Sequence, residues 1–128
     1  MIEQITKGIK ISIETKFEGT FYKDNSIHYA FSYEISIENQ SSEIAQLIAR
    51  KWNIMEALND NEIVIGEGVV GEQPILIPGE RHTYKSGCVL KSPFGAMKGN
   101  YLMLNPSNSK QFKVTIPTFK LSASFAQN

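Results

Sequence analysis

The chain of 128 residues contains one cysteine, so it cannot form an intramolecular disulfide, and a disulfide-built secreted scaffold is excluded. No apolar run approaches the roughly 20 residues of a membrane-spanning helix. The N-terminus lacks the basic and apolar regions of a signal peptide. A formal net charge of zero argues against a dedicated nucleic-acid binder. We therefore expect one cytoplasmic domain spanning residues 1–128, with no membrane insertion and no nucleic-acid partner.

Charge is unevenly distributed along the chain. Residues 1–80 hold all 13 acidic residues and six basic ones, a net charge of −7. Residues 81–128 hold seven basic residues and no acidic one, a net charge of +7. Because the strands of a compact domain interleave, we interpret this asymmetry as intramolecular complementarity rather than as two charged tails.

Alternation of apolar and polar residues dominates the first third of the chain. Ile9, Ile11 and Ile13 alternate with polar residues, and five apolar side chains share one parity from Tyr29 to Ile37. Period two with aromatic and β-branched side chains predicts half-buried strands. Residues 18–26 are expected to link these two strands. Residues 59–61 are expected to form a loop. Further short strands are predicted at residues 62–65, 82–91, 100–104, 112–116 and 119–123.

Residues 43–58 give conflicting signals. Apolar side chains follow one another at spacings of three and four, and Ser42 is a suitable N-cap, which favours a helix. However, Ile48, Trp52 and Ile54 share strand parity, and the surrounding segments are all predicted strands. The complete pattern of about seven or eight short strands predicts an all-β fold, an immunoglobulin-like or fibronectin type III-like antiparallel β-sandwich.

A Gly-x-Gly-x-x-Gly motif follows the predicted strand at residues 62–65. In a dinucleotide site such a motif opens a helix. Here Pro74 and Pro78 stand where the helix would run, and no acidic residue after Glu80 can hold a ribose. We therefore reject a dinucleotide fold. The glycines are expected to form a bulge or a crossover between sheets, and an anion nest of backbone N–H groups is the weaker alternative.

Other combinations of reactive side chains are weak. Six acidic residues between Glu56 and Glu80 lack a calcium-loop spacing and are interpreted as a solvated face. His28, His82 and Cys88 have no zinc spacing, and Cys88 is interpreted as a small strand residue. No serine lies in a nucleophile elbow. The sequence therefore predicts no enzyme, no cofactor and no metal site.

Several segments of the chain, in their order and spacing, resemble the bacterial ApaG (CorD) family. The resemblance runs from about Ile9 to Ala123. The segments are Trp52, GEGVVGEQP at 66–74, PGE at 78–80, YKSGC at 84–88, GAMKGNYLM at 95–103 and FKVTIPTF at 112–119.

The resemblance implies a fibronectin type III-like sandwich and therefore a strand over residues 43–58. The domain of this family is also similar to modules in eukaryotic F-box and polymerase-interacting proteins. This similarity implies a protein-interaction role. By name the family is linked to cobalt tolerance and magnesium efflux, and by gene neighbourhood to diadenosine-polyphosphate metabolism. It has no established catalytic residues.

The main hypothesis is a non-enzymatic interaction module with a protein partner. Its alternative is a binder of pyrophosphate or a dinucleoside polyphosphate at the glycine motif, and a divalent cation is a further candidate ligand. The protein-partner and the phosphate-binding hypotheses place the binding site in the same glycine-rich turn. The candidate site residues are Gly66, Glu67, Gly68, Gly71, Glu72, Gln73 and Pro74. Surface aromatics would add to a partner surface, and the candidates are Phe17, Phe21, Tyr22, Phe94 and Tyr101.

Overall fold

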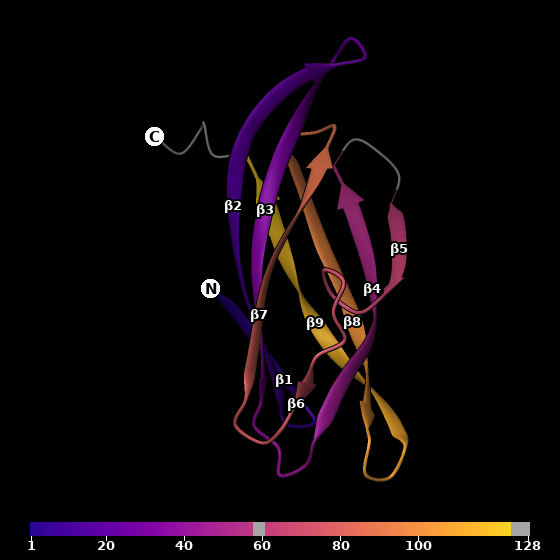
Figure 1. Ribbon diagram of the computed structural model, residues 1–128. Helices are drawn as coiled ribbons and strands as arrows, with labels where there is room; N and C mark the ends of the chain where they lie inside the picture. The colour runs from indigo at the N-terminus through magenta and orange to yellow at the C-terminus, as the bar shows by residue number, and fades with distance from the viewer. Residues whose placement is uncertain (58–60, 124–128) are drawn as a thin grey trace.

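The computed structural model describes residues 1–57 and 61–123, which form a sandwich of two antiparallel sheets (Figure 1). One sheet has the order β1-β2-β3-β7. The other has the order β5-β4-β8-β9, and the short β6 also pairs with β4. The strands are β1 (Ile2–Thr6), β2 (Ile9–Lys23), β3 (Ser26–Asn39), β4 (Ala45–Glu56), β5 (Glu62–Glu67), β6 (Ile75–Leu76), β7 (Arg81–Leu90), β8 (Phe94–Asn105) and β9 (Lys110–Ser122). The all-β sandwich prediction is confirmed.

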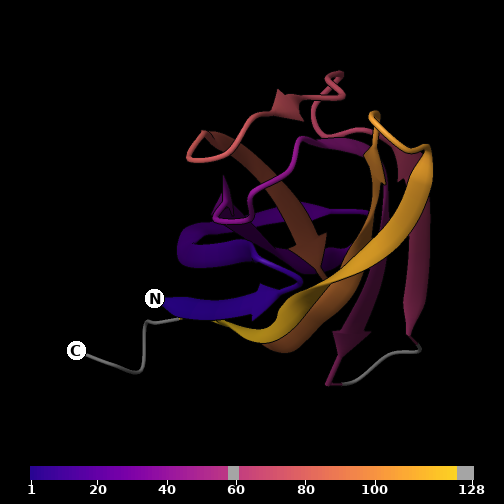
Figure 2. The ribbon, with the colours of Figure 1, turned by 90° about the horizontal axis from the view of Figure 1, so that it is seen from below.

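The core lies between the two sheets, which can be told apart in the view from below (Figure 2). Alternate residues of β2 and β3 point inward as predicted, and Ile11, Ile35 and Ile37 are completely buried. At the centre, the Tyr33 ring lies 5.6 Å from Trp52 and 5.7 Å from Phe119. Side chains of both sheets therefore interlock in one apolar interior, as expected for a sandwich.

The conflict over residues 43–58 is settled in favour of a strand, because Ala45–Glu56 form β4. Leu58 and the first two residues of the predicted loop at 59–61 lie outside the described residues. The helical spacing has a physical source. A β-bulge between Leu47 and Ala49 adds one residue to β4, so the apolar parity changes within the strand.

Two boundary predictions are wrong. Residues 18–26 are not a link, because β2 continues to Lys23 through a bulge between Phe17 and Gly19. Residues 112–116 and 119–123 are not two strands. They belong to the single strand β9, whose Pro117 lies where the pairing with β8 shifts register. The strands β1 and β6 were not predicted.

The segment after the glycine motif does not form a helix. It leaves β5 of one sheet, pairs briefly through β6 with β4, and enters β7 of the other sheet. The predicted crossover between sheets is therefore what these residues build. No helix within the described residues is long and apolar enough to cross a membrane.

Part of the charge asymmetry along the sequence is offset by ion pairs within the chain. Arg81 lies 3.4 Å from Glu38 and Lys85 lies 3.6 Å from Glu34, so two ion pairs join the basic and acidic parts of the sequence. The hairpin of β8 and β9 contains no acidic residue, however. Its lysines remain available on the outer face of the five-stranded sheet.

Candidate functional site

The predicted site is a tight reversal of the chain. The N–H of Val69 donates to the carbonyl of Glu72 at 2.8 Å, and the N–H of Glu72 donates back at 3.0 Å. Between them, Val70 has a φ of 48° and Gly71 a φ of 79°. Positive φ at both central residues is the pattern of a type I′ turn. Val70 is 63% exposed, and a β-branched residue in this conformation is strained.

The turn is tied to β4 on both sides. The N–H of Gly68 and the Gln73 amide both donate to the carbonyl of Ile48, at 2.8 and 2.9 Å. The Arg50 guanidinium donates to the carbonyls of Glu67 and Gly68 at 2.9 and 2.8 Å. The predicted site residues are therefore brought together in one braced segment.

Two glycines of the motif lie in close contact with β4 or the turn, and Gly68 is required because its contact is to backbone. A Cβ on Gly68 would lie 2.2 Å from the carbonyl oxygen of Glu72, and a Cβ on Gly66 would lie 2.9 Å from the Arg50 guanidinium. The N–H groups of Gly68, Val69 and Glu72 already donate to backbone carbonyls. Because these donors are occupied, the geometry favours an architectural role for the glycines over an anion nest.

Two of the reactive side chains singled out in the sequence, His82 and Cys88, lie on β7. Burial raises the pKa of the Cys88 thiol to about 11, so this group is protonated at neutral pH and is a poor nucleophile. His82 lies 3.5 Å from Glu72. Across the part of the chain that the structure describes, no group of three His, Cys, Asp or Glu residues is placed to hold a metal ion.

The strand that precedes the turn is an open edge. In the described part of the chain, β5 pairs only with β4. Its outer face carries Ile63 and Ile65, which are 59% and 72% exposed. They give the strand that leads into the predicted site an aliphatic outer face. The sequence identified this strand but could not show that it ends a sheet.

The candidate aromatic residues separate into two groups. Phe21, Tyr22 and Phe94 are exposed. Phe17 packs against the core and Tyr101 is completely buried, where its hydroxyl is hydrogen-bonded to that of Tyr84. The exposed pair Phe21 and Tyr22 lies near the tip of the β2–β3 hairpin, away from β5 (Figure 1).

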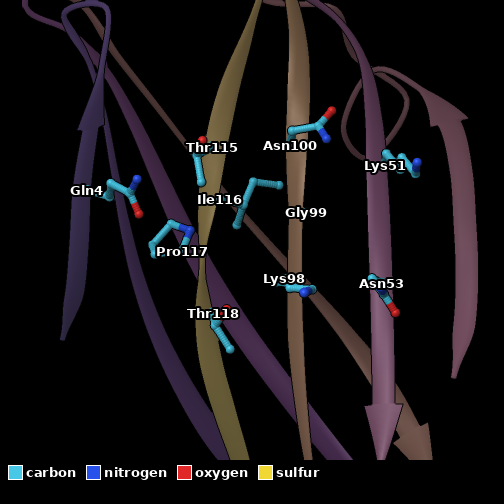
Figure 3. Close-up of a pocket in the computed structure, with 10 residues that line it drawn as sticks. All are labelled: Gln4, Lys51, Asn53, Lys98, Gly99, Asn100, Thr115, Ile116, Pro117 and Thr118. Atoms are coloured by element: carbon cyan, nitrogen blue, oxygen red, sulfur yellow. The ribbon is translucent and has the colours of Figure 1, made fainter.

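A second surface feature was missed by the sequence analysis. A pocket of about 340 Å³ lies on the outer face of the five-stranded sheet, where β4, β8 and β9 run side by side with β1 at its border (Figure 3). Its polar lining residues are Lys51, Asn53, Lys98, Asn100, Thr115, Thr118 and Gln4. The available signal was the repeated Lys-x-Asn of residues 51–53 and 98–100, but the sequence alone does not show that the two copies are adjacent.

Comparisons with known proteins agree on one family. The family model described as ApaG domain matches residues 20–105. Protein ApaG of Anaeromyxobacter dehalogenans is 40% identical over 121 residues, which covers 94% of each chain. Protein ApaG of Acidithiobacillus ferrooxidans is 40% identical over 123 residues, covering 96% of each. A crystal structure of a Bordetella pertussis protein, 36% identical, superposes with a TM-score of 0.78 over 89% of this chain and 92% of that one.

Proposed function

The chain belongs to the ApaG domain family, and from this premise we propose that it recruits another protein without catalysing a reaction itself. The observation that carries the proposal is the open edge of β5 with its exposed isoleucines. Unpaired N–H and C=O groups along a sheet edge accept an additional strand. The occupant that fits is an extended, apolar segment of a partner protein.

Three features support the edge of β5 as the docking surface. Ile63 and Ile65 are alternate residues of one strand and lie on one face. They would therefore contact alternate side chains of an added strand. The braced turn that follows β5 exposes Val70, which would add a further apolar contact to a partner. Because β4, Arg50 and Gln73 hold this segment in place, a partner would meet a preorganised surface and would lose less entropy on binding.

The proposal is tested by comparing protein capture from a lysate of the source organism with three forms of the chain. The double variant I63E/I65E places charge on the edge without entering the core. The matched control is I27E, because Ile27 is 51% exposed on the distant β2–β3 hairpin. We expect the same specific partner with the wild type and I27E and its loss with I63E/I65E. Equal retention by all three folded proteins would contradict the proposal.

We further propose that the family's link to cobalt tolerance and magnesium efflux operates through the recruited protein. The competing hypothesis is direct cation binding by the acidic stretch from Glu56 to Glu80. Titration with Co²⁺ and Mg²⁺, followed by amide chemical shifts, separates the two. We expect no saturable shifts over residues 61–80, whereas saturable shifts there would favour direct binding.

A further inference from the structure

The outer-face pocket is rich in hydrogen-bond donors and holds no acidic residue. Two lysine ammonium groups, three side-chain amides and two hydroxyls line it. Within residues 1–57 and 61–123, the side chains of Lys51, Lys98 and Asn100 make no ion pair or hydrogen bond. Four other basic side chains of the molecule are paired with glutamates at 3.4–3.9 Å. The two pocket lysines therefore make no close ion pair within the described residues.

Strand register gives these donors a specific arrangement. Lys51 pairs with Asn100, and Asn53 pairs with Lys98 across β4 and β8. Each lysine therefore has an amide directly opposite, and the two lysines are diagonal neighbours with backbone positions roughly 7–8 Å apart. The next strand adds Thr115 opposite Asn100. Two adjacent donor pairs thus lie side by side on one surface.

The backbone of β8 and β9 is irregular at this pocket. The pairing of β8 with β9 shifts register between Met97 and Gly99, so Lys98 lies opposite a bulge of β9 formed by Pro117 and Thr118. Gly99 is required, because a Cβ there would lie 1.9 Å from the carbonyl oxygen of Lys51. Bulges redirect side chains at functional sites. The buried Oδ1 of Asn53 has no hydrogen-bond partner among the described residues, but this oxygen only accepts, so the group of Asn53 that can bond a phosphate is its Nδ2.

We propose that this pocket binds a ligand with two adjacent phosphate groups, as in inorganic pyrophosphate or a larger diphosphate-bearing molecule. Each Lys–Asn pair supplies one charged and one neutral donor to one phosphate, and the threonine hydroxyls contact the remaining oxygens. The pocket contains no aromatic ring on which a base would stack, so recognition rests on the phosphates. This site is separate from the glycine turn and borders the proposed docking edge, because Lys51 and Asn53 pair with Ile65 and Ile63 across β4 and β5.

The test is an NMR and calorimetric titration of the intact protein with inorganic pyrophosphate at fixed ionic strength, repeated with inorganic phosphate. We expect saturable amide shifts at residues 51–53 and 98–100, and tighter binding of pyrophosphate than of phosphate. K51Q and K98Q should each weaken pyrophosphate binding about tenfold, because each removes a charge-assisted hydrogen bond. The matched control is K113Q. Lys113 is exposed on β9 outside the pocket, and its substitution should change affinity by less than about twofold.

Three outcomes would overturn the proposal. They are no saturable shift at 10 mM pyrophosphate, shifts confined to the glycine turn at residues 66–74, and an equal weakening by K113Q, which would indicate a diffuse basic face. A parallel titration with ADP identifies the source of the diphosphate. ADP binding no tighter than pyrophosphate supports recognition of the phosphates alone, and tighter ADP binding with the same dependence on Lys51 and Lys98 supports a nucleotide. Unchanged partner capture by K51Q would show that the two surfaces are independent.

Discussion

At the scale of single residues, the glycines of the turn have different roles. Gly68 has a φ of +60° and its missing Cβ would lie 2.2 Å from the carbonyl oxygen of Glu72, whereas Gly71 has a φ of +79° and open space around it. We predict that Gly68→Ala lowers the free energy of unfolding by more than about 2 kcal/mol, from the combined backbone strain and clash. Gly71→Ala should cost about 1 kcal/mol, from backbone strain alone. Urea denaturation followed by circular dichroism measures both, and equal losses would contradict the assigned roles.

A substitution of Val70 should change stability and partner binding in opposite directions. Asn at this position would create the Asn-Gly pair that a type I′ turn prefers, and it tolerates positive φ better than a β-branched residue. We predict that Val70→Asn raises the free energy of unfolding by about 1 kcal/mol while weakening partner capture, because it removes an exposed apolar contact. Thermal denaturation and the capture assay measure the two effects. A variant that is stabilised and captures the partner as well as the wild type would exclude Val70 from the docking surface.

Single residues also show how far the site could be predicted from the sequence. The two prolines and the absence of an acidic residue after Glu80 were sufficient to reject a cofactor-binding helix, because both can be read directly from the sequence. The proximity of Lys51 and Lys98 could not be predicted. Their positions are 47 residues apart in the chain, and only the pairing of β4 with β8 brings them together.

At the scale of strands, three difficulties of the sequence analysis occur at β-bulges, whereas the missed strands β1 and β6 have other causes. The extra residue beside Leu47 produced the apparent helical spacing in β4. The bulge at Gly19 hid the second half of β2, and the irregularity opposite Lys98 divided β9 at Pro117. A bulge changes the parity of a strand without ending it, so a period-two pattern stops although the pairing continues. The regular strands, β3 above all, were predicted correctly.

The close contact of β4 with β8 depends on Gly99. A Cβ there would lie 1.9 Å from the carbonyl oxygen of Lys51, so any side chain must push the two strands apart. We predict that Gly99→Ala lowers the free energy of unfolding by about 1–3 kcal/mol, the usual cost of overpacking. Amide chemical shifts should change over residues 51–53, since these face the new methyl group. An unchanged stability with unchanged shifts would show that the contact is easily relaxed.

At the scale of the whole molecule, buried ionisable side chains lie between the two sheets. They are the hydroxyls of Tyr84 and Tyr101, which are hydrogen-bonded to each other, and the thiol of Cys88. Burial raises the pKa values of Tyr84 and Tyr101 above 10.0, and burial raises that of Cys88 from 9.0 to about 11. A raised pKa in the folded state favours folding below the unfolded pKa, and this contribution is lost as the pH rises through the folded value. Stability should therefore be constant from about pH 7 to pH 9 and fall at higher pH.

The alkaline loss of stability has a specific test. Each group that is protonated only in the folded state contributes a slope of about 1.4 kcal/mol per pH unit. Tyr84→Phe removes one such group, so the decline of the unfolding free energy between pH 10 and pH 11 should become shallower. Urea denaturation at several pH values measures this slope. A variant as steep as the wild type would mean that Tyr84 ionises without unfolding the sandwich.

The central claim is that the open edge of β5 receives a strand from a partner protein. Amide hydrogen exchange of the free protein and of its complex with the captured partner tests it most directly, because a new ladder of hydrogen bonds slows exchange only where it forms. We predict slower exchange over residues 62–67 in the complex, with little change in the β2–β3 hairpin. Unchanged exchange along β5, with protection of the hairpin around Tyr22 instead, would contradict the account.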